Sequence, residues 1–195
     1  MLAEKLSKKE QLDEKLLLTK LVLGDHNAFN TIYATYVKQL THYASKFTAD
    51  IYIIEDCIHD IFVWLWQNKK NLEITYTLKG YLLKCVRSSI LRKVQKQKKT
   101  VLLEDTDDEN VFSFCISSEE KFVHSESDFI LREKMSSVLG LLTSKQKEVI
   151  YLRFYQNLSF DEIAISMDLT TKACYKLMGR AISELRKSSL HELQT

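Results

Sequence analysis

The sequence has no proline and only four glycines among its 195 residues. Because proline and glycine end helices and form turns, their scarcity predicts long helices joined by short connections. No apolar run approaches the ~20 residues that a membrane-spanning helix needs, and the charged N-terminus lacks the apolar stretch of a signal peptide. We therefore expect an all-α cytoplasmic protein without direct membrane insertion.

Residues suited to metal or disulfide chemistry are also sparse. The four cysteines share no CxxC spacing, which argues against a zinc or redox site: Cys57, Cys85, Cys115 and Cys174. All but Cys115 fall in helical patterns and are expected to be small buried hydrophobic residues in a reducing compartment. His59 follows Asp56 by three residues, as in some helical metal sites, but no second such motif completes the site. The sequence thus predicts no metal and no other cofactor.

The sequence also has no large excess of positive or negative charge, since its net charge is only +2. This is modest for a protein that binds DNA alone. The total conceals a basic block at residues 84–99, with seven Lys or Arg and no acid, and an acidic block at residues 104–128, with nine Asp or Glu and one Lys. The near-neutral total is therefore the sum of a basic block and the acidic block that follows it.

Residues 100–126 show no hydrophobic period and are acidic and rich in serine. We interpret them as a flexible linker with a few docking contacts, since a fully disordered tether would be poorer in aromatic residues. The apolar side chains available for such contacts are Val111, Phe112, Phe114 and Ile116. An alternative is that the acidic charge mimics nucleic acid and occupies a basic groove, but a solubilising linker is the simpler interpretation.

The chain before this linker reads as a compact helical domain. The pattern predicts helices at residues 13–23, 26–47, 51–68 and 78–98. Gly24 suits the end of the first helix, and Asp25 and Asp50 suit the N-caps of the second and third. The third helix has one apolar face, formed by Ile51, Ile54, Ile58, Ile61, Phe62 and Leu65.

The opposite face of this third helix is polar, and two tryptophans lie at its edges. It carries Asp56, His59, Asp60, Val63 and Gln67, with Trp64 and Trp66 on either side. Carboxylates framed by large aromatic side chains suit a protein-docking surface. Alternatively, both tryptophans pack against neighbouring helices of the same domain, and the sequence leaves these two interpretations open.

The fourth helix has a buried side and a basic aromatic side. Its buried side is marked by Leu82, Val86, Ile90 and Val94, and its other side by Tyr81, Lys84, Ser88, Arg92 and Gln95. Aromatic rings on which bases stack, beside cations that hold phosphates, suit single-stranded or distorted DNA. A solvated basic face is the alternative, but the clustering of charge favours nucleic acid.

The C-terminal half predicts a helix from about residue 127 to 142 and a second at 144–156, capped by Thr143 with Gln146 and ended by Asn157. Ser159 and Glu162 form another capping box, which opens a short helix that runs to Met167. Asp168 then occupies a turn that requires a left-handed backbone, which Asp tolerates better than most residues other than Gly.

The last helix is amphipathic. Thr170 can cap it, and its buried stripe is Cys174, Leu177, Met178, Ala181, Ile182 and Leu185. Its outer face is Thr171, Lys172, Tyr175, Lys176 and Arg180. Two helices joined in this way match the helix-turn-helix layout, whose second helix enters the DNA major groove. An ordinary helical hairpin within a bundle is the alternative.

Together these segments resemble an RNA polymerase sigma factor of the extracytoplasmic-function type. GDHNAFNTIYATY, IIEDCIHDIFVWLW and YLLKCVRSSILRK resemble region two of that family in order and spacing. LLTSKQKEVIYLRFYQNLSFDEIAISMDLTTKACYKLMGRAISELRK resembles region four. The resemblance implies two small helical domains joined by a flexible linker: a tail at 1–12, a region-two-like domain at 13–99, the linker at 100–126 and a region-four-like domain at 127–190.

The resemblance also implies site residues and partners. The segment that docks on core RNA polymerase would be Asp56, His59, Asp60, Val63, Trp66 and Gln67. The segment that reads and melts the minus-ten promoter element would be Lys69, Lys70, Asn71, Tyr76, Lys79, Tyr81, Lys84, Arg87, Ser88 and Arg92. The reader of the duplex minus-thirty-five element would be Thr170, Thr171, Lys172, Tyr175, Lys176 and Arg180. Core polymerase and promoter DNA are thus expected partners, and an anti-sigma factor is implied by the habit of the family.

Some residues depart from the family pattern. His59 stands where Gln is frequent and Ser88 where Asn is frequent, which affects individual contacts. A stand-alone helix-turn-helix regulator is the main alternative function, and a sigma mimic that sequesters an anti-sigma protein is another. An enzyme is the least supported class, since the sequence has no Gly-rich phosphate loop, no nucleophile motif and no complete metal cluster.

Overall fold

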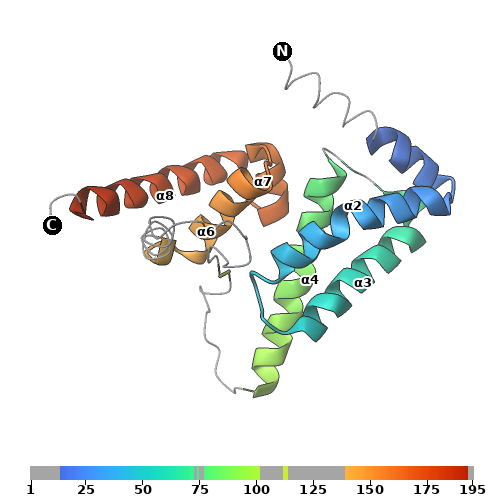
Figure 1. Cartoon of the computed structure of the whole chain (residues 1–195), viewed down its shortest axis with the longest axis horizontal. Helices are drawn as coiled ribbons and strands as arrows, with labels where there is room; N and C mark the ends of the chain where they lie inside the picture. The colour runs from blue at the N-terminus through green and yellow to red at the C-terminus, as the bar shows by residue number, and fades with distance from the viewer. Residues whose placement is uncertain (1–13, 73, 75–76, 102–111, 114–138, 193–195) are drawn as a thin grey trace, which may run out of the picture. The chain divides into compact units, whose positions relative to one another are not determined.

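A computed structural model of the chain describes residues 14–72, 74, 77–101, 112–113 and 139–192. The chain forms two compact units: the first comprises Met1–Glu104 with the short segment Ile165–Met167, and the second comprises the rest of the chain. All regular structure in the described residues is helical (Figure 1). The predicted all-α, two-domain fold is therefore confirmed. Within these residues, no helix combines the length and the apolar character needed to cross a membrane.

The N-terminal unit contains a helix over residues 14–22, α2 (His26–Ala44), α3 (Ile51–Gln67), the 3-10 turn η1 (Lys69–Asn71) and α4 (Leu78–Val101). The predicted caps are present. Gly24 has a positive φ of 87° at the end of the first helix. The Asp25 side chain accepts from the backbone N–H groups of Asn27 and Ala28, and Asp50 caps α3 in the same way. These caps satisfy amide groups that a helix start leaves without partners.

The helices α2, α3 and α4 pack on one another around an apolar core. The core includes Leu40, Ile58, Leu65, Leu82 and Ile90, as the helical periods predict. The expected apolar face of α3 holds apart from Ile51, which is 55% exposed, because it lies in the first turn beyond the end of the packed core. The helix α2 ends at Ala44, earlier than the predicted 47.

Helices α3 and α4 run antiparallel, as contacts along their length indicate. The start of α3 lies beside the end of α4, where Gln97 Nε2 donates to Asp50. The Cys57 thiol, in the middle of α3, points at the Val86 carbonyl oxygen. At the other end the Trp64 and Tyr81 rings lie 6.3 Å apart. This arrangement places the end of the basic block of α4 against the acidic residues of α3.

The C-terminal unit contains α6 (Ser144–Ile150), the π-helical turn η2 (Tyr151–Tyr155), α7 (Phe160–Met167) and α8 (Thr171–Glu192). A continuous helix was expected at 144–156, but its last part is π-helical, with Gln156 N–H donating to the Tyr151 carbonyl. The wider turn buries Tyr151 and Leu152 and turns Phe154 outward, to 62% exposure. The predicted helix at 127–142 and the linker lie mostly outside the described residues.

The turn between α7 and α8 has the geometry predicted for a helix-turn-helix. Ser159 and Glu162 form the capping box of α7, with Ser159 N–H donating to the Glu162 carboxylate at 2.8 Å. Asp168 has a φ of +56°, and Leu169 N–H donates to the Ala164 carbonyl at 2.8 Å. This is a Schellman-type helix end with Asp in the left-handed position. The buried side of α8 begins with Cys174, Met178 and Ala181.

Candidate functional site

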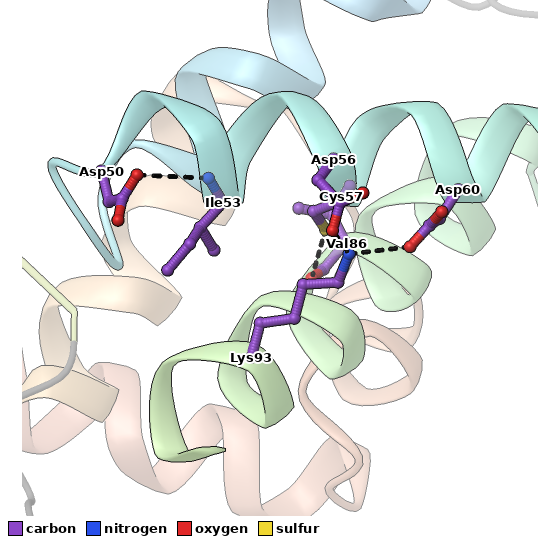
Figure 2. A network of polar contacts seen from close by, with 7 residues as sticks. All are labelled: Asp50, Ile53, Asp56, Cys57, Asp60, Val86 and Lys93. Carbon is purple, nitrogen blue, oxygen red and sulfur yellow. Dashed lines mark hydrogen bonds and ion pairs between the residues drawn. The ribbon is translucent and has the colours of Figure 1, made fainter. Parts of the chain in front are cut away.

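The polar face of α3 is exposed, but a lysine from α4 already binds its two aspartates (Figure 2). Asp56 and Asp60 are one helical turn apart, with side chains 64% and 56% exposed. Lys93 Nζ donates to Asp60 Oδ2 at 2.7 Å and also forms an ion pair with Asp56. Burial alone lowers the pKa of Lys93, but the hydrogen bonds and charges of the two aspartates outweigh it and raise the pKa. The cluster therefore has a net charge of −1, with carboxylate oxygens still open to solvent.

The remaining predicted docking residues on α3 differ in accessibility. His59, Val63 and Gln67 are exposed. Trp66 is half-buried, since its ring lies 4.5 Å from the ring of His26 and 5.2 Å from that of Phe29 in α2.

The two tryptophans of α3 differ in how far they pack within the N-terminal unit. Lys69 Nζ sits 4.0 Å above the Trp66 ring and donates to the Trp66 carbonyl at 2.9 Å. Trp64 is 44% exposed beside Tyr81. The alternative in which the tryptophans pack inside their own domain therefore applies to Trp66 more than to Trp64.

The residues predicted to contact the minus-ten element lie on η1 and α4, except Tyr76, which lies outside the described residues. Lys69, Lys70 and Asn71 form η1. At 100° per residue, α4 presents one stripe along its length: Tyr81, Lys84, Ser88 and Arg92. Lys79 and Arg87 project from other sides of α4, so the structure does not bring them into this stripe. Burial, together with the neighbouring Cys85, raises the pKa of Tyr81, so its hydroxyl remains a hydrogen-bond donor.

The six residues predicted on α8 divide into two groups. Three have partners within the C-terminal unit: the Thr170 hydroxyl oxygen accepts from Ala173 N–H, Thr171 Oγ1 donates to Asp161 at 2.8 Å, and the Tyr175 ring lies 4.0 Å from that of Phe160. The other three are exposed and follow one line at four-residue spacing: Lys172, Lys176 and Arg180. Among the described residues, no ion pair holds these three cations.

Two family models match the chain in order: Sigma-70 region 2 over residues 32–100, and Sigma-70, region 4 over residues 138–187. Together they cover more than half of the sequence. This chain belongs to the sigma-70 family. The predicted resemblance to RNA polymerase sigma factors is confirmed at the level of this family. Helices α3 and α4 lie in region 2 of this sigma factor, and α6, α7 and α8 lie in region 4.

Solved structures share the fold of this sigma factor. CnrH, solved in complex with the cytosolic domain of CnrY, matches with a TM-score of 0.59 and 19% identity over 93% of this chain and 99% of that one. The sigma factor RpoE of Bartonella quintana, solved with the anti-sigma factor NepR, matches with a TM-score of 0.59 and 19% identity over 82% and 95%. A search of curated proteins found no significant match.

Sequence reasoning missed three residues that shape these surfaces of the sigma factor: Lys93, Phe160 and Asp161. Lys93 was counted in the basic block, although it projects about 100° away from Arg92 and hence toward α3. Phe160 and Asp161 follow the cap of α7, where a helix-turn-helix brings the first helix close to the second. The helical wheel shows which side of a helix each residue occupies, but it does not show which neighbouring helix lies on that side.

Proposed function

We propose that this sigma factor binds core RNA polymerase through α3 and directs promoter-specific initiation of transcription. In this proposal η1 and α4 read and melt the minus-ten element, and α8 reads the minus-thirty-five element. In the same proposal, region-two function belongs to residues 13–99 and region-four function to residues 127–190, the bounds expected from the sequence. The observation that carries the proposal is the placement of exposed charge: an acidic cluster on α3, a basic aromatic stripe on α4 and three aligned cations on α8.

The α3 cluster suits a protein partner with positive charge. Asp56 and Asp60 keep more than half of their side-chain surface open, and a carboxylate accepts several hydrogen bonds at once. Because Lys93 holds both carboxylates from one side, their free oxygens are presented on the other. Exposed His59 and Val63 extend this surface along α3. A basic element of core polymerase would dock there.

The α4 stripe suits unpaired bases, and the α8 line suits duplex DNA. Tyr81 provides a ring and a hydroxyl donor beside Lys84 and Arg92, the combination used to bind single strands. Lys172 and Lys176 follow α8 at the spacing that brings side chains to one face of a recognition helix. Their cations neutralise phosphates or donate to guanine. The modest net charge fits a factor whose affinity for DNA comes largely through core polymerase.

The further partner we propose is an anti-sigma factor. RpoE of Bartonella quintana was solved with the anti-sigma factor NepR, and CnrH with the cytosolic domain of CnrY. The same fold over most of each chain supports a comparable partner here. The protein would act in the cytoplasm, where polymerase and chromosome are, as a non-catalytic factor.

Binding to core polymerase and mapped transcription starts test the proposal. The purified chain is mixed with host core polymerase, and starts are mapped on fragmented host DNA. Asp60→Lys should weaken core binding at least tenfold, while Glu55→Lys, the same charge reversal on another side of α3, should change it little. Lys176→Ala should reduce promoter-dependent starts with core binding intact, and Lys145→Ala on α6 is its matched control.

The outcomes separate the candidate functions. Absence of core binding together with absence of new starts would overturn the sigma-factor mechanism. Selective DNA binding by the isolated chain, lost in both Asp60→Lys and Lys176→Ala, would instead establish a stand-alone helix-turn-helix regulator.

A further inference from the structure

Tyr175, on the outer face of α8, is held by a stack of side chains that begins in η2. The Tyr175 ring is 58% exposed, yet its centroid lies only 4.0 Å from that of Phe160, with 30° between the planes. Phe160 is the first residue of α7, and the guanidinium of Arg153 lies 5.3 Å from the centroid of the Phe160 ring. Arg153 Nη1 in turn donates to the Leu158 carbonyl at 2.8 Å. Arg153, Phe160 and Tyr175 thus form a stack that links η2, α7 and α8.

The stack restricts an otherwise mobile residue. An exposed tyrosine on a helix can occupy more than one χ1 rotamer, but a close, tilted contact with another ring favours the rotamer that makes this contact. Phe160 is itself anchored, because the capping box of Ser159 and Glu162 fixes the first turn of α7. The direction of the Tyr175 ring is therefore set by α7 rather than by α8 alone.

The helix surface one turn beyond Tyr175 lacks a side chain, because residue 179 is a glycine. Gly179 lies one turn further along α8, is exposed, and would meet no heavy atom within 4 Å if it carried a Cβ. Glycine inside a helix costs roughly 1 kcal/mol relative to alanine. Within the part of the chain that the structure describes, no packing explains this glycine, whereas a close approach by another molecule would.

The hydroxyls of the two other uncharged candidates have partners within the C-terminal unit. The Thr170 hydroxyl oxygen accepts from Ala173 N–H, and the Thr171 hydroxyl donates to Asp161, so its hydrogen is not available to a base. Lys172 and Lys176 flank Tyr175 and suit phosphates, whose contacts carry no sequence information. Tyr175 is left as the group with an apolar edge and a fixed direction beside the open surface at Gly179.

We propose that Tyr175 reads a thymine through its 5-methyl group in the major groove of the upstream promoter element, and that Phe160, backed by Arg153, is the residue that positions it. This inference rests on the proposed function of α8. Apolar contact with the thymine methyl is one of the few ways in which an uncharged side chain distinguishes base pairs in that groove. The partner is duplex DNA, and the chemical group recognised is one methyl.

Replacing thymine by uracil removes that methyl and nothing else, which makes it the probe. The complex of the full chain with core polymerase is titrated with an upstream-element duplex in which each thymine is replaced in turn by uracil. We expect one position at which uracil weakens binding about fourfold, the value for one buried methyl group. Tyr175→Ala should bind thymine and uracil duplexes equally at that position. Phe160→Ala should lose at least half of the preference, and the double variant should be no different from Tyr175→Ala.

Matched variants keep the result decisive. Phe160→Leu retains apolar bulk without a flat ring, so it should fold like the parent and still lose the preference. Phe154→Ala, an exposed aromatic outside the stack, should retain it. Lys176→Ala should weaken binding to every duplex by a similar factor while the uracil preference stays. Gly179→Ala should weaken binding to the duplexes.

The inference is overturned if no thymine shows the preference, or if Tyr175→Ala retains it. It is also overturned if Phe160→Leu and the parent discriminate equally. None of these results touches the proposed function, which is tested separately by binding to core polymerase and by the mapped transcription starts.

Discussion

Replacing Lys93 with methionine removes the cation that holds Asp56 and Asp60 (Figure 2) while keeping an apolar stem of similar length. Each ion pair is partly exposed, and such pairs contribute about 0.2–1 kcal/mol. Without Lys93 the two carboxylates, one turn apart, also repel by a few tenths of a kcal/mol. We therefore expect Lys93→Met to lower the free energy of unfolding of the N-terminal unit by about 1–2 kcal/mol.

Urea unfolding followed by tryptophan fluorescence measures this loss in the intact chain. The sequence has only two tryptophans, Trp64 and Trp66, and both lie in α3. Their fluorescence therefore reports the N-terminal unit and not the C-terminal one. The loss should shrink in high salt, because exposed charges are screened.

A second background tests the cause. In an Asp56→Asn, Asp60→Asn protein, Lys93→Met should cost only a few tenths of a kcal/mol, because the charges it balances are gone. An equal loss in both backgrounds would refute the reasoning and show that Lys93 acts through the packing of its stem. The direction in which this stabilisation changes with pH is also defined. Because the pKa of Lys93 is raised in the folded state, the stabilisation is complete below the ordinary value of 10.5 and is lost as pH rises through the folded pKa.

Three further changes test the C-terminal turn, the π-helical segment and a buried thiol. Asp168→Ala should lower the free energy of unfolding by about 1 kcal/mol, while Asp168→Gly should not, because φ is +56° there and glycine adopts this backbone without strain. Urea titrations followed by circular dichroism compare the two variants, and equal losses of stability would contradict the backbone explanation. Tyr151→Phe removes the hydroxyl that accepts from Gln156 Nε2 at 2.9 Å and should cost about 1–2 kcal/mol in a thermal melt, whereas an unchanged melt would mean that the bond contributes nothing. Cys57 is fully buried, and burial raises the pKa of its thiol, so a thiol reagent followed by mass spectrometry should modify it only in urea; rapid labelling of the native chain would disprove this.

Local chemistry allowed much of the fold to be predicted. Asp25, Asp50, Thr143 and Ser159 cap helices through hydrogen bonds that reach only two or three residues along the chain. Asp168 takes a left-handed backbone because the turn after it requires one. Helical periodicity likewise identified the buried side of α4 and that of α8 apart from Ile182, which is exposed, since it depends only on spacing within one helix.

Contacts between elements required the tertiary structure. Lys93 lies 37 positions from Asp56, and its pairing depends on how α4 is rotated and shifted against α3. The Trp66 ring could not be placed until the start of α2 was known to lie beside it.

The sequence by itself determined two helical regions and a last helix with a basic outer face, because caps and helical periods are local properties, and its resemblance to the sigma factors indicated the family that the family models show. Only the tertiary structure decided which of its exposed residues are free. It showed that Asp56 and Asp60 share a lysine, that Thr171 is bonded to Asp161, and that Tyr175 rests on Phe160. The reason is physical: a helical wheel gives the direction of a side chain, but the packing angle between helices gives its partner.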